Sequence, residues 1–295
     1  RTGKPRLLLA LLLTALPQAQ GEELKRRGLF GIQAVAVPED LRKELNLPPN
    51  RGVMASRVIP GSAAEQAGMF ARDVIISVQG GAIDSPEQFV QTVGRYRAGD
   101  ILQANLLRRA VNETLDLTRS VTLKSYPLES APDFTIEYGS AKSALTTHRT
   151  IVTRPVAPGK SPAVLLLGGI GCYSLDLPFD DANAYKKILY HLTRRGLTTF
   201  RVEKTGMGDS LGPPCSQADL NAEIAGYAAG LRALIEDTRV DSERIYLLGH
   251  SIGGMIAPVL ANEFPVRGVI AIGTVGISWF EYELENNRRQ GTLAG

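Results

Sequence analysis

The feature that most constrains the fold of this chain is the stretch RIYLLGHSIGGMIAP at residues 244–258. A short apolar run, typical of a buried strand, leads into Gly-His-Ser-Ile-Gly and then into small and apolar residues at helical spacing. A serine at a sharp turn between a strand and a helix is the context in which G-x-S-x-G indicates a nucleophile. Gly249 and Gly253 leave room for the strand and the helix to approach. Ser251 can therefore project its hydroxyl beside the amide of Ile252.

The chain from residue 134 onward has the order of elements that such a turn requires. Two alternating runs come first, and helical patterns then separate apolar, strand-like runs at 163–167, 197–202, 245–248 and 266–272. This alternation predicts a doubly wound sheet, whose ligands bind beyond the carboxyl ends of its strands. In this order and in the serine motif, residues 134–295 resemble the α/β-hydrolase superfamily. The resemblance favours a catalytic serine over the alternative, a glycine-rich turn in an ordinary α/β protein.

A glycine loop at residues 168–171 directly follows the apolar strand AVLLL. In the hydrolase superfamily, a His-Gly-X segment at this place supplies the second amide of the oxyanion hole. Gly168 stands where the histidine is usual and Gly169 matches the glycine, so the resemblance implies the Ile170 amide as the donor. One preoriented donor of this kind stabilises the transition state by about 3–4 kcal/mol. The alternative interpretation is a tight turn that requires glycine.

The next loop, EKTGMGDS at residues 203–210, resembles the D-x-R-G-x-G-x-S segment of the same superfamily. Lys204 and Thr205 occupy the turn that usually contains an arginine. We interpret the loop as shaping the site, and its acidic residues Glu203 and Asp209 as structural rather than as acid–base groups.

The histidines of the chain do not complete a catalytic triad. In the superfamily the acid and the histidine follow the serine, whereas all three histidines, His148, His191 and His250, precede Ser251. The segment from residue 134 is also shorter than the roughly 200–250 residues that folds of this type commonly need. We therefore expect a partial, C-terminally truncated hydrolase domain, with the triad acid and base beyond residue 295. The alternative is a degraded hydrolase that binds without catalysis.

A further helical pattern follows the last predicted strand, at residues 279–289. We expect this helix to lie over the site as a lid. Its carboxylates, Glu281, Glu283 and Glu285, are therefore poor candidates for the triad acid.

The run VIPGSAA at 58–64 is the most specific of several motifs in residues 28–123. On these motifs, residues 28–123 resemble a bacterial PDZ domain, a small mixed β fold with two helices that is appended to periplasmic serine proteases. GLFGI at 28–32 falls where the family's carboxylate-binding loop precedes its peptide-pairing strand, which implies peptide contacts at Phe30, Gly31 and Ile32. Arg72 departs from the family, which has glycine before the aspartate of this turn.

The PDZ resemblance implies that an extended peptide C-terminus adds as a strand to the edge of a sheet. The run SPEQ at 85–88 has the residues of a helix start: a serine cap, a proline at the first position and a glutamine for a capping box. We expect this helix to continue to about Val93 and to form the other wall of the groove. The alternative is a PDZ fold used for packing or dimerisation without a free ligand.

Two shorter segments complete the predicted organisation. Residues 1–20 resemble a signal peptide, with a basic start, an apolar run at 7–16 and a small residue, Ala19, for cleavage. The apolar run is too short to span a bilayer, so we expect an exported bacterial protein, periplasmic or secreted. Residues 124–133, KSYPLESAPD, have two prolines and few apolar residues, which indicates a linker.

Composition narrows the classes of partner. A net charge of +3 without clustering gives no indication of nucleic-acid binding. The sequence contains no zinc-ligand spacing, no Walker A loop and no complete G-x-G-x-x-G, so we expect neither a metal nor a cofactor.

The hydrolase resemblance also implies a pairing of the two cysteines. Cys172 follows the glycine loop and Cys215 ends the loop after the next strand, and these two strands are neighbours in a hydrolase sheet. Export implies an oxidising compartment, where a pair of cysteines usually forms a disulfide. We therefore predict a bridge between Cys172 and Cys215, with two free thiols as the alternative.

These inferences predict an exported serine hydrolase that cleaves small carboxylic esters through Ser251. A PDZ domain for peptides or chain tails would precede the hydrolase domain. The alternatives are a serine peptidase of the same fold and a non-catalytic peptide-binding protein.

Overall fold

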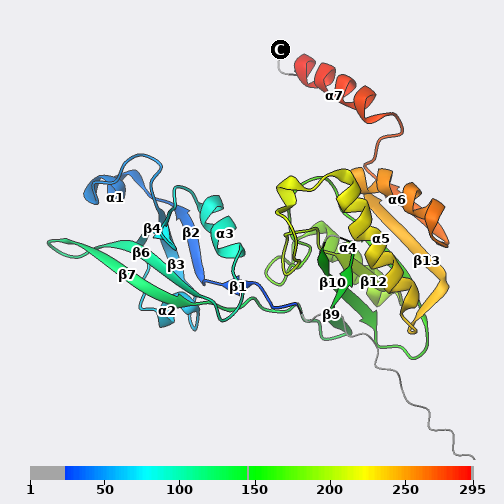
Figure 1. The fold of residues 1–295 in the computed structure, drawn as a ribbon, viewed down its shortest axis with the longest axis horizontal. Helices are drawn as coiled ribbons and strands as arrows, with labels where there is room; N and C mark the ends of the chain where they lie inside the picture. The colour runs from blue at the N-terminus through cyan, green and yellow to red at the C-terminus, as the bar shows by residue number, and fades with distance from the viewer. Residues whose placement is uncertain (1–23, 145, 294–295) are drawn as a thin grey trace, which may run out of the picture.

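The computed structural model describes residues 24–144 and 146–293, which form two units of different architecture (Figure 1). The predicted signal peptide, residues 1–20, lies outside the described residues. No helix in the described part of the chain is both long and apolar enough to cross a membrane.

The N-terminal unit is built on an antiparallel sheet with the strand order β2-β3-β4-β6-β7, in which β5 pairs with β4. Apolar side chains from the sheet and from two helices form its core, which includes Phe30, Val53, Ile75 and Leu106. The edge strand β2 pairs with β3, and α3 packs beside it. The elements of this unit are β1 (Gly28–Leu29), β2 (Ile32–Ala36), α1 (Glu39–Glu44), β3 (Val53–Val58), α2 (Ala63–Gln66), β4 (Val74–Val78), β5 (Gly81–Ala82), α3 (Pro86–Gly94), β6 (Ile101–Arg109), β7 (Thr114–Thr122) and β8 (Lys124–Ser125).

Two local features of this unit follow from its sequence. The predicted start of α3 is confirmed: Ser85 Oγ accepts from the Gln88 amide at 3.2 Å, and Gln88 Oε1 accepts from the Asp84 amide at 2.7 Å. Arg72 has a φ of +70°. Glycine reaches this left-handed region without steric cost, so Arg72 holds a backbone conformation that glycine would adopt more easily.

The C-terminal unit contains a six-stranded sheet in the order β14-β13-β11-β12-β10-β9. Strands β9 and β10 are antiparallel, as expected for the opening pair, whereas β12, β11, β13 and β14 are parallel to one another. The elements are β9 (Phe134–Lys142), β10 (Thr147–Pro155), β11 (Ser161–Leu167), α4 (Ala184–Arg194), β12 (Thr198–Val202), a 3₁₀ turn (Cys215–Gln217), α5 (Leu220–Glu236), β13 (Val240–His250), α6 (Ile252–Glu263), β14 (Gly268–Ile272) and α7 (Trp279–Leu293).

Helices cover both faces of this sheet, as a doubly wound fold requires. Successive residues of a strand point to opposite faces, and β11 shows the consequence. Its Leu165 packs in a cluster with Leu231 of α5 and Leu260 of α6. Its neighbour Leu166 packs on the other face with Leu189 of α4. The continuous apolar runs of the sequence are therefore strands buried on both sides.

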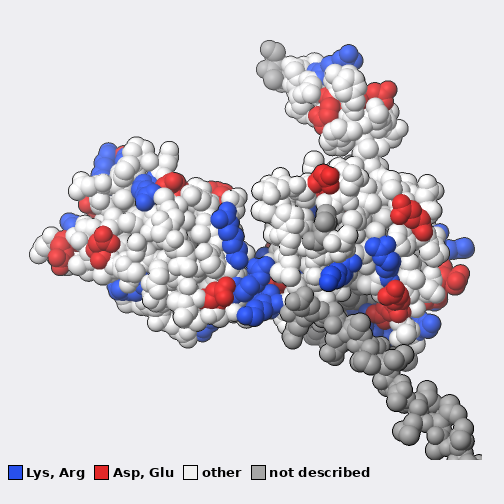
Figure 2. All heavy atoms as spheres, viewed as in Figure 1, with Lys and Arg blue, Asp and Glu red and all other residues white. Residues whose placement is uncertain are grey.

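The two units are joined by two segments of chain that lie together. Strand β1 pairs with β8 in antiparallel register, and Arg26, just before β1, forms an ion pair of 2.6 Å with Asp209 of the C-terminal unit. On the face drawn in Figure 2, a group of Lys and Arg side chains lies where the two units meet. Elsewhere on that face, charges of both signs are interspersed.

The predicted linker, residues 124–133, begins with β8 and is bound in part to the C-terminal unit. Glu129 is buried and its carboxylate pairs with Arg201 of β12 at 2.8 Å. Its backbone amide donates to Tyr138 of β9. A composition rich in proline and polar residues predicts that a segment lacks regular secondary structure. It does not predict whether the segment is exposed to solvent.

The predicted lid was placed wrongly. The helix itself forms as α7, but none of its residues is buried, and it extends away from the sheet (Figure 1). After Leu284 the helix consists mainly of charged and amide side chains, ENNRRQ at 285–290, so no continuous apolar face holds it against the sheet.

Candidate active site

Ser251 occupies a strained turn between β13 and α6. Its backbone has φ +54° and ψ −123°, a conformation that costs a residue other than glycine about 1–3 kcal/mol. A Cβ on Gly249 would overlap the Gly253 carbonyl, and a Cβ on Gly253 would overlap the Leu167 carbonyl. The two glycines therefore permit the close approach that bends the chain so sharply at the serine.

The first turn of α6 brings backbone amides next to this serine. The first N–H groups of any helix have no partner within the helix, and the Ser251 side chain makes no capping hydrogen bond to them. The Ile252 amide is the first of these groups, at the positive end of the helix dipole. A negative charge that forms on a group attached to Ser251 Oγ would be stabilised by this positive end of the helix.

The glycine loop after β11 lies directly beside the serine. A Cβ built on Gly169 would be 3.4 Å from Ser251 Cβ and 3.1 Å from His250 Nδ1. The structure thus places Gly169, in the loop predicted to belong to the site, next to Ser251.

Three tyrosines hold the backbone of the glycine loop. The Gly168 amide donates to Tyr227 Oη at 3.0 Å, and the Gly169 amide donates to Tyr185 Oη at 3.2 Å. The Tyr173 hydroxyl donates to the Gly169 carbonyl at 3.0 Å. These residues were missed at the sequence level, because Tyr185 and Tyr227 come from helices α4 and α5.

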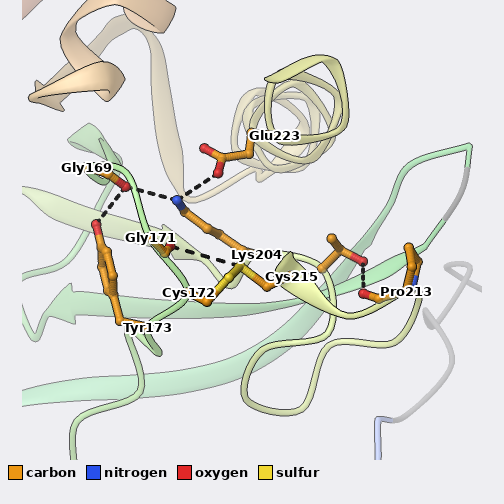
Figure 3. Close-up of a disulfide and its surroundings, with 9 residues drawn as sticks. Gly169, Gly171, Cys172, Tyr173, Lys204, Pro213, Cys215 and Glu223 are labelled. Carbon is orange, nitrogen blue, oxygen red and sulfur yellow. Dashed lines mark hydrogen bonds and ion pairs between the residues drawn. A yellow bond between two sulfur atoms is a disulfide. The ribbon is translucent and has the colours of Figure 1, made fainter. Parts of the chain in front are cut away.

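A buried lysine completes the contacts of this loop. Lys204 Nζ donates to the Gly169 carbonyl at 2.9 Å and to Glu223 Oε1 at 2.8 Å (Figure 3). The Lys204 side chain is only 6% exposed. The sequence placed Lys204 in a loop that shapes the site, but it did not identify the contact.

The predicted disulfide between Cys172 and Cys215 is present, with a Cα separation of 5.7 Å (Figure 3). Its two loops leave the carboxyl ends of β11 and β12, which are parallel neighbours. The bridge therefore ties the end of the glycine loop to the following loop.

The described residues contain no hydrogen bond between Ser251 and a histidine. His148 is buried and bonds Ser143 Oγ at 3.1 Å and the Glu203 carbonyl at 3.0 Å, and burial lowers its pKa. His191 lies on the exposed side of α4. His250 Nδ1 forms a hydrogen bond of 2.6 Å with Tyr185 Oη. Tyr185 in turn binds the Gly169 amide, so His250 helps to hold the glycine loop.

The acidic residues of the second loop have structural partners. Asp209 is buried and accepts from Arg26, from the Arg27 amide and from Arg149. Glu203 Oε1 accepts from Ser174 Oγ and from the amides of Leu175 and Asp176. Burial raises the pKa of Glu203 to about 7, against the lowering effect of these hydrogen bonds.

The residues predicted to bind a peptide lie at the start of β2. Phe30 is buried and packs edge-on against Phe89 of α3, with ring centroids 5.1 Å apart. Its side chain is therefore part of the core, and only its backbone is left for a ligand. Gly31 has a φ of +93°, and Ile32 begins the edge strand.

Comparison with known proteins adds to this geometry. Residues 179–279, which include Ser251, match the family described as serine aminopeptidase, S33. Esterase EstD of Thermotoga maritima is 29% identical over 121 residues, which are 41% of this chain and 29% of the esterase.

Two periplasmic serine endoproteases of Escherichia coli are also similar. DegQ is 33% identical over 99 residues and DegP is 36% identical over 97 residues, each covering 32% of this chain. The matches cover 22% of DegQ and 20% of DegP, so the chain spans less than a third of the length of these curated relatives.

Solved structures align over about half of the chain. A hypothetical protein of Pseudomonas aeruginosa aligns with a TM-score of 0.43 and 16% identity, covering 58% of this chain and 57% of its own. The esterase Est22 aligns with a TM-score of 0.41 and 21% identity, covering 50% and 47%. The family match and the curated relatives together support a serine hydrolase.

Proposed function

We propose that this protein is an exported serine hydrolase that cleaves carboxylic esters through an acyl-enzyme on Ser251. The observation that carries the proposal is the strained serine at the start of α6, with the glycine loop directly beside it. The similarity to an esterase supports the choice of ester over amide.

The proposed reaction uses two backbone amides. As Ser251 Oγ attacks the ester carbonyl, its proton passes to a base and the carbonyl electron pair moves onto oxygen. The amides of Ile252 and Ile170 stabilise this oxyanion. Collapse of the intermediate breaks the bond to the alcohol, which leaves with the proton, and water then hydrolyses the acyl-enzyme by the same route.

We propose that the triad acid and base lie outside the described residues. The support comes from β14, an edge strand on which Val269, Ile270 and Ile272 are 38–48% exposed. Within the described residues β14 pairs with β13 alone. An apolar open edge is normally covered in a folded protein, and further strands of the same sheet would cover it.

The test is an assay of the full-length gene product with short p-nitrophenyl esters. Turnover that disappears in Ser251→Ala supports the proposal. Turnover that persists in Ser251→Ala, or no turnover at all, contradicts it.

A second candidate is a serine peptidase of the same fold, which the family description favours. Aminopeptidase substrates tested in parallel distinguish it from an esterase. If Ser251 supports neither activity, the third interpretation remains, a non-catalytic peptide-binding protein.

We further propose that the N-terminal unit is a PDZ domain that binds a peptide C-terminus between β2 and α3. Its support is the open edge of β2, the left-handed Gly31 before it, and the similarity to DegQ and DegP. Peptides with free C-termini should bind, and the same peptides with amidated C-termini should not. Equal binding of both forms would contradict carboxylate recognition.

Export is supported by the disulfide, because such bonds persist in oxidising compartments. Cell fractionation should place the protein outside the cytoplasm, and a cytoplasmic protein with free thiols would refute this part of the proposal.

A further inference from the structure

Lys204 makes a contact that the proposed reaction does not by itself require. Its ammonium group is buried and bound to two acceptors, the carbonyl oxygen of Gly169 and the carboxylate of Glu223 (Figure 3). The carbonyl belongs to the same peptide group as the Ile170 N–H, the proposed oxyanion donor. The lysine and the oxyanion would therefore lie at opposite ends of one peptide group.

The planarity of the peptide fixes the direction of this donor. In a trans peptide the C=O and the N–H point in opposite directions. Lys204 and Tyr173 both donate to the Gly169 carbonyl, so the Ile170 N–H points away from them. Within the described residues the Ile170 amide donates to no protein acceptor, which leaves it free for an oxyanion.

A charged donor on the carbonyl also changes the strength of the N–H. Hydrogen bonds arranged in a chain polarise one another, and those to ionised groups are the strongest. An ammonium group that draws electron density toward the Gly169 oxygen makes the N–H of the same peptide a better donor. The effect is larger at a buried site than in water, and the Lys204 side chain is 6% exposed.

We propose that Lys204 is a positioning residue that orients and polarises the Gly169–Ile170 peptide for the oxyanion. Glu223 balances the buried ammonium charge, and Tyr173 acts as a second, neutral donor to the same carbonyl. The inference rests on the proposed ester hydrolysis at Ser251. Lys204 would act in the transition state, where the carbonyl oxygen is charged, and little in the bound ester.

The chain provides a matched control in Lys186 of α4. Its Nζ also donates to a backbone carbonyl, that of Leu177, at 2.7 Å, and it pairs with Asp181 at 2.7 Å. Its side chain is 7% exposed, close to the 6% of Lys204. The two lysines therefore match in their own burial and in the types of partner they bind. They differ in the carbonyl, and also in the exposure of the carboxylate, which is 93% for Asp181 and 16% for Glu223.

The first experiment measures polarisation without catalysis. The amide proton of Ile170 is followed by ¹H–¹⁵N NMR in the wild-type chain, in Lys204→Gln and in Lys186→Gln. We expect an upfield shift of this proton in Lys204→Gln alone, because a weaker donor has a less deshielded proton. If Lys204→Gln fails to fold, Lys204→Arg is measured instead. It keeps the positive charge, so it should fold and the Ile170 proton should keep its wild-type chemical shift. An Ile170 proton that responds equally in both glutamine variants, or in neither, overturns the proposal.

The second experiment measures catalysis in the full-length gene product. Loss of a whole oxyanion donor lowers kcat by about 10²–10³-fold, so a weakened donor in Lys204→Gln should lower kcat by about tenfold or more. KM should remain within about twofold. An aryl trifluoromethyl ketone, which forms a tetrahedral adduct with an active serine, should lose affinity by the same factor as kcat. Lys186→Gln should change none of these.

The two experiments separate failure of the inference from failure of the function. A wild-type protein that hydrolyses no ester and forms no adduct contradicts the proposed function, while the NMR shift still decides whether Lys204 polarises the peptide. A loss of kcat matched by an equal rise in KM would indicate a merely structural role for Lys204 and would also overturn the proposal.

Discussion

The carboxylate of Glu129 and the guanidinium of Arg201 form an ion pair of 2.8 Å in which both side chains are fully buried. Burial alone would raise the pKa of Glu129, but the charge and hydrogen bonds of Arg201 hold it below its usual value. The pair connects the segment between the two units to the centre of the C-terminal sheet.

Replacement of Glu129 should therefore destabilise the C-terminal unit. Removal of one partner of a buried ion pair leaves the other charge uncompensated, which costs about 3–5 kcal/mol. We expect Glu129→Gln to lower the free energy of unfolding by an amount in this range, measured by urea denaturation. Asp133→Asn is the control, because Asp133 pairs with Arg194 in an exposed bridge and should cost less than about 1 kcal/mol. Equal effects of the two substitutions would contradict the structural role of the buried pair.

The raised pKa of Glu203 predicts a pH dependence of stability. Its folded-state pKa of about 7 exceeds the ordinary value of 4.5. The protonated form is therefore favoured by folding, and this contribution is complete below pH 4.5 and lost as the pH rises through 7.

Glu203→Gln should remove this dependence. The amide oxygen can accept the three hydrogen bonds of Oε1 and carries no charge to bury, so the variant should match the wild type near pH 4.5 and exceed its stability at pH 8. The gain is limited to about 3 kcal/mol by the size of the pKa shift. Thermal unfolding at the two pH values measures it, and a variant less stable than the wild type at pH 8 would refute the assignment.

The strained backbone of Ser251 predicts an unusual order of stability among inactive variants. Glycine adopts a positive φ without steric cost, whereas alanine keeps the strain of the native turn. We expect Ser251→Ala and Ser251→Gly both to lack ester turnover, with Ser251→Gly the more stable by about 1 kcal/mol. Differential scanning calorimetry distinguishes them. If alanine is the more stable of the two, the turn is not strained in solution.

Loss of the disulfide should lower both stability and activity. The bridge spans 43 residues of sequence, and a loop of this size corresponds to about 3–4 kcal/mol on the chain-entropy estimate. The double variant Cys172→Ser/Cys215→Ser should unfold at a lower temperature and turn over esters more slowly, because the glycine loop loses its tie to the neighbouring loop. A thiol titration of the denatured exported protein should find no free thiol, and two free thiols would show that the bridge does not form.

Local patterns predicted the parts of the site that are contiguous in the chain. The serine turn, the glycine loop and the apolar strands each carry their signal within a few residues. The supports of the glycine loop carry no such signal, because Tyr185, Lys204 and Tyr227 reach it from different elements that only the folded sheet brings together. Their identity depends on how the helices cross the sheet, which hydrophobic periodicity does not specify.

One long-range contact did leave a trace in the sequence. Arg201 lies in the otherwise uncharged strand TTFRV, and an arginine in a strand buried on both faces needs a partner. The partner, Glu129, lies 72 positions earlier in a segment without periodicity. The sequence therefore indicates that Arg201 needs an acidic partner, but it does not indicate which acidic residue is that partner.

The two segments that join the units have a consequence for exchanging the N-terminal unit. Leu24 and Arg26 contact the hydrolase unit before β1 begins, and Glu129 contacts it after β8 ends. The N-terminal unit is thus held to the C-terminal unit at both of its ends. Strands β1 and β8 are paired, so the two ends of the N-terminal unit lie side by side. A domain that replaces residues 28–125 would preserve the contacts of both flanking segments only if its own N- and C-termini are also adjacent.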